Sequence, residues 1–146
     1  MTDEQELLKQ GWIKSRLWFE VMGVSKEVTE KSLKAHVEKL EKLDGVKVLQ
    51  KKFEKVEAVK KLPSYLKKTG LKKAFSQVVE TVILTDSIEK LLLVVMLFGP
   101  SAIEVLEPKE LKVGIGTIQT IMNSVADMMH RIASSTMGGI IIRGKK

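Results

Sequence analysis

The side chains best suited to catalysis lie on one predicted helix in the last third of the sequence. Gln119, Asn123, Asp127 and His130 follow one another at spacings that place them on one helical face. There Asp127 would orient His130 as a general base or hold it as a metal ligand. The pattern is much more typical of the solvated side of an amphipathic helix, because no second cluster of histidines or carboxylates converges on it. We therefore interpret the chain as non-enzymatic.

Metal and cofactor chemistry have little support in the composition. The sequence contains no cysteine and only two histidines, His36 and His130, far apart along the chain. Cysteine-based zinc and iron–sulfur sites are thus excluded. A short glycine-containing segment, 114–117, precedes a predicted helix whose first N–H groups would suit an anion. The full dinucleotide and P-loop fingerprints are absent, so we expect no cofactor and no metal.

The net charge of +7 is concentrated in one segment. Between Lys42 and Lys73 the chain has eleven lysines against three acidic residues, a local charge of +8, and the remainder is close to neutral. A cationic block of this kind attracts polyanions through counterion release and long-range steering. Lysine is also the usual residue of a solvated surface, so solubility or thermal adaptation is the competing interpretation.

From this segment we predict association with nucleic acid, RNA or DNA, mainly through phosphate contacts. Tyr65 is a candidate stacking group between the lysines. An oligomeric small-molecule-sensing or regulatory module is the alternative. The candidate phosphate contacts are Lys51, Lys52, Lys60, Lys61, Lys67, Lys68, Lys72 and Lys73.

The hydrophobic patterns predict an α+β fold. We expect strands at 17–22, 46–59, 75–84 and 101–106, helices at 25–43, 86–98 and 117–136, and a connection at 62–73. The segment 46–59 changes the parity of its apolar residues, which indicates a bulged strand or two strands. This order is that of a ferredoxin-like βαββαβ sandwich with an additional C-terminal helix. The length of 146 residues fits a single domain, 1–146.

Both faces of the predicted sheet look apolar. Leu17, Phe19 and Val21 would share one face, while Trp18 and Met22 lie on the other. Trp18 and Phe19 are therefore predicted to be core residues, not a stacking platform for bases. The second face would be covered by the C-terminal helix or by another copy of the chain, which favours a homodimer. The apolar stripe of that helix follows a 3-4-3-4-3 spacing, at Ile115, Ile118, Met122, Val125, Met129 and Ile132.

No targeting or membrane segment is evident. The first residues are acidic, unlike a signal peptide, and the longest apolar run, 91–98, is far shorter than the about 20 residues of a spanning helix. We expect a cytoplasmic protein that does not bind membranes.

Two segments carry a resemblance to known proteins. The block 98–108, FGPSAIEVLEP, and the Met-rich helix 121–130, IMNSVADMMH, together resemble a group of small uncharacterised archaeal α+β proteins. The strand part of the first block also resembles the closing strand of ligand-sensing WYL-type domains, whose defining aromatic motif is missing. Neither resemblance implies an activity or a set of functional residues.

Overall fold

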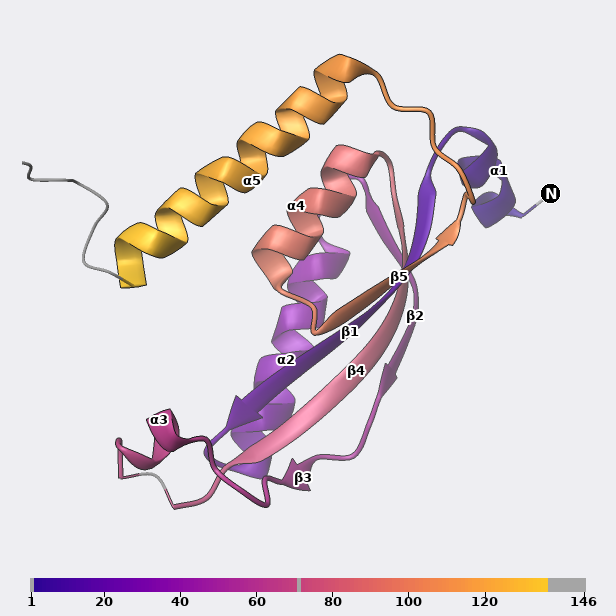
Figure 1. Ribbon diagram of the computed structural model, residues 1–146. Coiled ribbons are helices and arrows are strands. Elements are labelled where there is room, and N and C mark those ends of the chain that lie inside the picture. Colours follow the sequence, from indigo (N-terminus) through magenta and orange to yellow (C-terminus); the bar gives the residue numbers. More distant parts are fainter. Residues whose placement is uncertain (1, 71, 137–146) are drawn as a thin grey trace, which may run out of the picture. The chain divides into compact units, whose positions relative to one another are not determined.

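The fold is built on an antiparallel sheet in which β4 pairs with three other strands. The computed structural model describes residues 2–70 and 72–136, in which every strand pairing is antiparallel. The order of the strands is β2-β4-β1-β5, and β3 pairs with the beginning of β4 (Figure 1). The strands are β1 (Ile13–Gly23), β2 (Val46–Phe53), β3 (Glu57–Ala58), β4 (Phe75–Thr85) and β5 (Ala102–Glu107).

The helices of the described residues include the three predicted ones and two short ones. They are α1 (Asp3–Lys9), α2 (Lys26–Glu41), α3 (Ser64–Lys67), α4 (Ile88–Phe98) and α5 (Ile115–Thr136). The sequence pattern did not predict α1, because a seven-residue acidic helix has too few apolar residues to show a helical hydrophobic period. The structure reveals its capping box: the Gln5 N–H donates to Thr2 Oγ1 and the Thr2 N–H donates to Gln5 Oε1.

Local signals fix most element ends. Ser25 begins α2 by accepting a hydrogen bond from the Val28 N–H at 3.1 Å. Gly45, with φ +80°, turns the chain between α2 and β2 in the left-handed conformation that favours glycine. The helix α4 is capped by Ser87, which accepts from the Lys90 N–H at 3.1 Å. The D-x-x-E pattern at residues 86–89 predicts a capping box that begins at Asp86, and the structure corrects this by one residue.

The parity change in the segment 46–59 has a structural cause. The pairing of β2 with β4 shifts register between Val48 and Gln50, which leaves Leu49 as the extra residue of a bulge. The strand then stops at Phe53, and a separate short strand, β3, continues the pairing with β4. The prediction of a bulged strand or two strands is confirmed in both respects.

The core lies between one sheet face and the two helices α2 and α4, which cover it (Figure 1). Leu17 and Phe19 of β1 are buried there, as predicted. The helix α4 is less buried than its apolar composition suggests. The nearly all-apolar composition of this segment predicts a helix buried on all sides, but Leu97 is 61% exposed, so that prediction is wrong. The core cluster consists of Leu17, Phe19, Leu33, Val37, Leu40, Val46, Val79, Ile83 and Val94.

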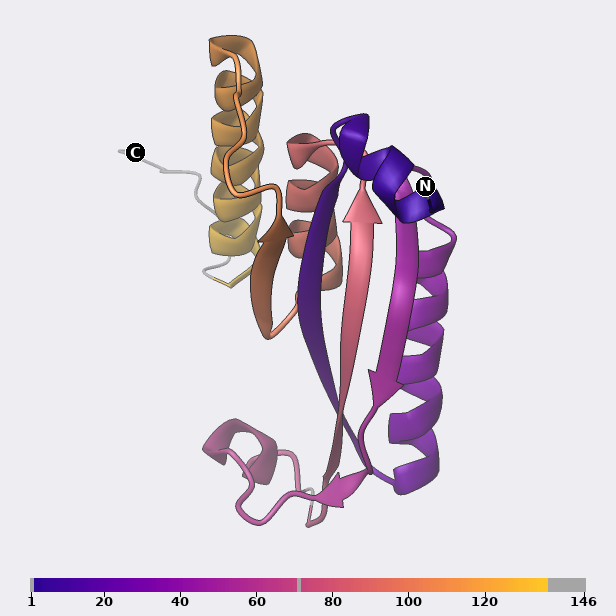
Figure 2. The ribbon, with the colours of Figure 1, turned by 90° about the vertical axis from the view of Figure 1, so that its right-hand side faces the viewer.

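The second face of the sheet is more polar than expected. Along β1 it presents Lys14, Arg16 and Trp18, the last of which is only half-buried. Its apolar residues on β4, Val82 and Leu84, are buried at the end of the sheet where α1 crosses the strands (Figure 2). The prediction of a second apolar face thus holds only at that end, and α1 provides the cover there.

The chain divides into two compact units between residues 110 and 111. The first contains the sheet with α1 to α4, and the second contains α5. A single domain and a second sheet face covered by α5 remain predictions. Among the helices that the structure describes, none has the length and apolar character needed to cross a membrane. The cytoplasmic location also remains a prediction.

Replacing a core side chain of α2 tests the packing. We expect Leu33→Ala to lower the free energy of unfolding by about 2–5 kcal/mol, because Leu33 is fully buried and the cavity would be lined by neighbours that cannot close it. The matched control is Val28→Ala on the same helix, where the side chain is 46% exposed and the change should cost less than about 1 kcal/mol. Urea denaturation measures both; equal losses would contradict this packing.

Candidate functional site

Six of the candidate lysines lie on one loop, residues 60–73, which we call the lysine loop. Its two ends are held together by backbone pairing. Glu57 and Ala58 of β3 pair with Ser76 and Phe75 of β4, and the next bond joins the Val59 N–H to the Ala74 carbonyl at 2.9 Å. This neck places the residues that leave β3 beside those that enter β4, and thereby gathers two lysine pairs that lie eleven residues apart in sequence. The members are Lys60, Lys61, Lys67, Lys68, Lys72 and Lys73.

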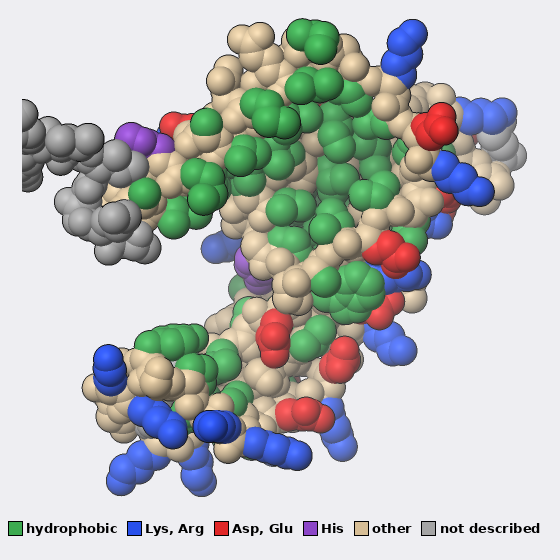
Figure 3. Space-filling model, in the orientation of Figure 1, with side chains coloured by type: hydrophobic (Ala, Val, Ile, Leu, Met, Phe, Trp, Pro, Cys, Tyr) green, Lys and Arg blue, Asp and Glu red, His purple; other side chains and the backbone are tan. Residues whose placement is uncertain are grey.

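The lysine loop is cationic without any internal compensation. All six lysines are exposed, and the sequence has no acidic residue between Glu57 and Glu80. No carboxylate of the described residues lies within ion-pair distance of the six ammonium groups. In Figure 3 the basic side chains gather around the projecting part that Figure 1 labels α3. Their positive potential therefore extends into solvent.

The tip of the loop is the single helical turn α3. Pro63 precedes it, where the missing N–H of proline costs nothing, and its carbonyl accepts from the Lys67 N–H at 3.2 Å. Gly70 ends the turn in the left-handed conformation, with φ +82°. The turn presents Tyr65 to solvent with 67% of its surface exposed. The predicted stacking candidate and six of the predicted phosphate contacts are thus on the same projecting segment.

The structure separates Lys51 and Lys52 from this loop. They are neighbours on β2, so their side chains point to opposite faces of the sheet. Lys51 forms an ion pair with Glu41 of α2 at 3.0 Å. Lys52 lies opposite Glu80 in the register of β2 and β4. Sequence proximity to the other lysines therefore did not make these two part of one surface.

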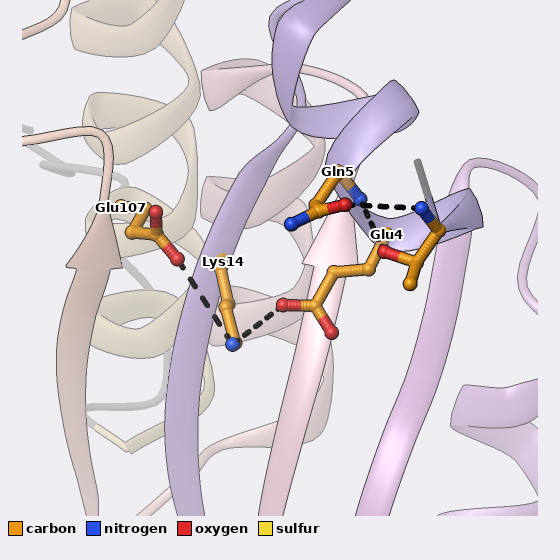
Figure 4. Close-up of polar contacts among 5 residues, drawn as sticks. Glu4, Gln5, Lys14 and Glu107 are labelled. Atoms are coloured by element: carbon orange, nitrogen blue, oxygen red, sulfur yellow. Dashed lines mark hydrogen bonds and ion pairs between the residues drawn. The ribbon is translucent and has the colours of Figure 1, made fainter.

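The second sheet face has a group of ion pairs along β1. Arg16 contacts Glu80 through Nε at 3.3 Å and Glu104 through Nη1 at 2.9 Å. Lys14 lies between Glu4 at 2.6 Å and Glu107 at 4.0 Å (Figure 4). Sequence analysis missed these pairs because the partners come from four elements and meet only through the strand register and the position of α1. A base-stacking platform on this face would have to displace them.

A shallow hollow of about 390 Å³ lies between α2 and the sheet edge formed by β2. Its rim has charges of both signs, from Glu30, Lys34 and Glu38 of α2, and its lining includes Phe53 and Gln77. The mixed charges do not define a ligand. Within the described residues no group of three histidine or acidic side chains is arranged to hold a metal ion.

The two histidines are in different surroundings. His36 is half-buried between the rings of Phe19 and Phe98, and its Nε2 lies 2.8 Å from the Phe98 carbonyl. This contact joins α2 to the end of α4, which is a structural role. His130 is exposed on α5, and Asp127, its candidate partner, forms an ion pair with Arg131 at 3.0 Å. The contacts around Asp127 thus link it to an arginine and not to His130.

Comparisons with known proteins identify one family. The model of the MJ0538 family matches residues 14–144, which is most of the chain. This span includes both segments that resemble small archaeal proteins, so the resemblance is confirmed at the level of a family. No curated protein and no solved structure matches.

Limited digestion with trypsin tests the geometry of the lysine loop. We expect cleavage after lysines 60–73 well before cleavage after Lys47, Lys51 or Lys52, because the backbone of β2 is paired with β4 and that of the loop tip is exposed. Mass spectrometry of the first fragments identifies the sites, and the β2 lysines serve as the internal control. Simultaneous cleavage at both places would contradict the described pairing.

Proposed function

The chain belongs to the MJ0538 family, and we propose that it associates with RNA or DNA through the lysine loop, without being an enzyme. The single observation that supports this is the gathering of six exposed lysines on one projecting segment with no carboxylate among them. A cluster of this kind releases counterions when it contacts phosphates, which supplies affinity without sequence readout. Lys51 and Lys52 contribute less in this proposal, since Lys51 is paired with Glu41 and both lie on β2, outside the lysine loop.

We further propose that the first unit has the ferredoxin-like βαββαβ arrangement. The strand order β2-β4-β1-β5 supports this. The helix α2 connects β1 to β2 with β4 between them, and α4 connects β4 to β5 with β1 between them. The lysine loop then lies in the connection between the second and third strands of that arrangement. It projects from the end of the sheet and not from its open face (Figure 1).

Neutralising the neck lysines of the loop tests the proposed function. We expect binding to random oligonucleotides to weaken in a variant that has Gln in place of Lys60, Lys61, Lys72 and Lys73. The slope of log affinity against log salt should fall by about 3 to 4, since each lost phosphate contact contributes about 0.7 to 0.9. Fluorescence anisotropy at a series of salt concentrations measures the slope.

A control with the same net charge separates the loop from general electrostatics. Lys26, Lys31, Lys34 and Lys39 are exposed on α2, and changing all four to Gln also removes four charges. We expect this variant to keep most of the wild-type slope. A wild-type protein that binds neither RNA nor DNA at low salt would refute the proposal, and equal effects of both variants would refute the assignment to the loop.

A second candidate function is an oligomeric small-molecule-sensing or regulatory module, and one observation on α5 supports its oligomeric part. The six apolar residues of its stripe are each 39% exposed or more, at the a and d spacing of a two-helix seam. An exposed stripe of this length is typical of a helix that pairs with a partner helix. The partner proposed here is a second copy of the chain, which gives a homodimer.

Sedimentation velocity tests the homodimer by comparing two single variants at neighbouring positions of α5. We expect Met122→Lys, at a stripe position that is 61% exposed, to convert a wild-type dimer into a monomer, because the seam would bury an unpaired charge. Asn123→Lys adds the same charge on the polar side of α5 and should leave the dimer intact. A wild-type monomer at all protein concentrations would refute this candidate.

A further inference from the structure

We infer that the lysine loop binds single-stranded nucleic acid in preference to duplex. This inference rests on the proposed function and concerns the same site. It depends on the one aromatic side chain of the loop, Tyr65, and on where the loop places it.

The ring of Tyr65 is available to a ligand. It is 67% exposed, and within the described residues it makes no hydrogen bond and no ring contact. An aromatic side chain normally contributes a large buried area to a core or an interface, so this ring gains nothing from its present surroundings. A flat surface beside several ammonium groups matches a nucleotide, which combines a flat base with a phosphate.

The helical turn fixes the relation between the ring and its neighbouring charges. The Lys68 N–H donates to the Ser64 carbonyl at 3.3 Å, which extends the turn of α3 by one residue. Residues three apart in such a turn share one side, so Lys68 lies on the side of Tyr65. A base stacked on Tyr65 therefore has a cation beside it for the adjacent phosphate.

Only an unpaired base can use this arrangement. In a duplex the base faces are stacked on one another, so a projecting loop contacts a double helix mainly through its phosphates. On a single strand each base has a free face, and stacking on an aromatic side chain adds about 1–3 kcal/mol per base. The second sheet face is less suited to stacking, because ion pairs surround Arg16 there and Trp18 is half-buried.

The experiment compares three probes of equal length: oligothymidylate, its duplex with oligoadenylate, and an abasic strand. We expect the wild-type chain to prefer oligothymidylate, and Tyr65→Leu to lower that affinity about 5- to 150-fold, the range that the stacking energy implies. The same variant should not change binding to the duplex or the abasic strand, nor the salt slope. Tyr65→Phe keeps the ring and should retain most of the affinity. Circular dichroism verifies that both variants fold.

The outcomes separate this inference from the proposed function. The wild-type chain could bind single strand and duplex with equal affinity, and the variant with Gln at Lys60, Lys61, Lys72 and Lys73 could lose both. That result would overturn the preference for single strands but not the association with nucleic acid. Binding to none of the three probes at low salt would overturn both. Binding only to vesicles that contain phosphatidylserine, with loss in Tyr65→Leu, would assign the loop to an anionic membrane surface and also overturn both.

Discussion

The hydrogen bonding of β4 is the constraint on which the rest of the first unit depends. This strand pairs with β1 along its full length and, on its other edge, with β2 and then β3. Its alternate residues form the floor of the core, and its first residues close the neck of the lysine loop. The two roles are linked, because the ladder that buries Val79 is the same one that brings Val59 to Ala74. A shift of one residue in that register would expose the core and open the loop together.

Charge is distributed over this frame in two different ways. On the sheet, strand register brings cations and carboxylates opposite one another, as for Arg16 with Glu80 and Glu104. Such surface pairs stabilise a fold only slightly, but they cancel the local field. In the lysine loop no carboxylate from the described part of the chain is within ion-pair distance, so the field of its ammonium groups extends into solvent. The position of a charge in the fold, more than the number of charges, decides which part of a basic protein attracts a polyanion.

Much of the fold was predictable because it depends on short-range signals. The cap Ser25, the left-handed Gly45 and the bulge at Leu49 each follow from the steric and hydrogen-bonding properties of a few adjacent residues. The errors arose where a distant element intervenes. The helix α1 covers one end of a sheet face that was expected to need α5 or a second copy. The cap of α4 is Ser87 and not Asp86, whose carboxylate instead accepts a hydrogen bond from the Ser87 hydroxyl at 3.1 Å.

The sequence by itself determined the number of lysines, their segment, the absence of acidic residues between Glu57 and Glu80, and the tyrosine among them. Only the tertiary structure decided which lysines lie together. Lys52 is as close in sequence to Lys60 as Lys60 is to Lys68, yet Lys51 and Lys52 lie on β2 with side chains on opposite faces, and Lys51 is paired with Glu41. The reason is that pairing between β3 and β4 is a long-range contact, and it alone sets which ends of the segment meet.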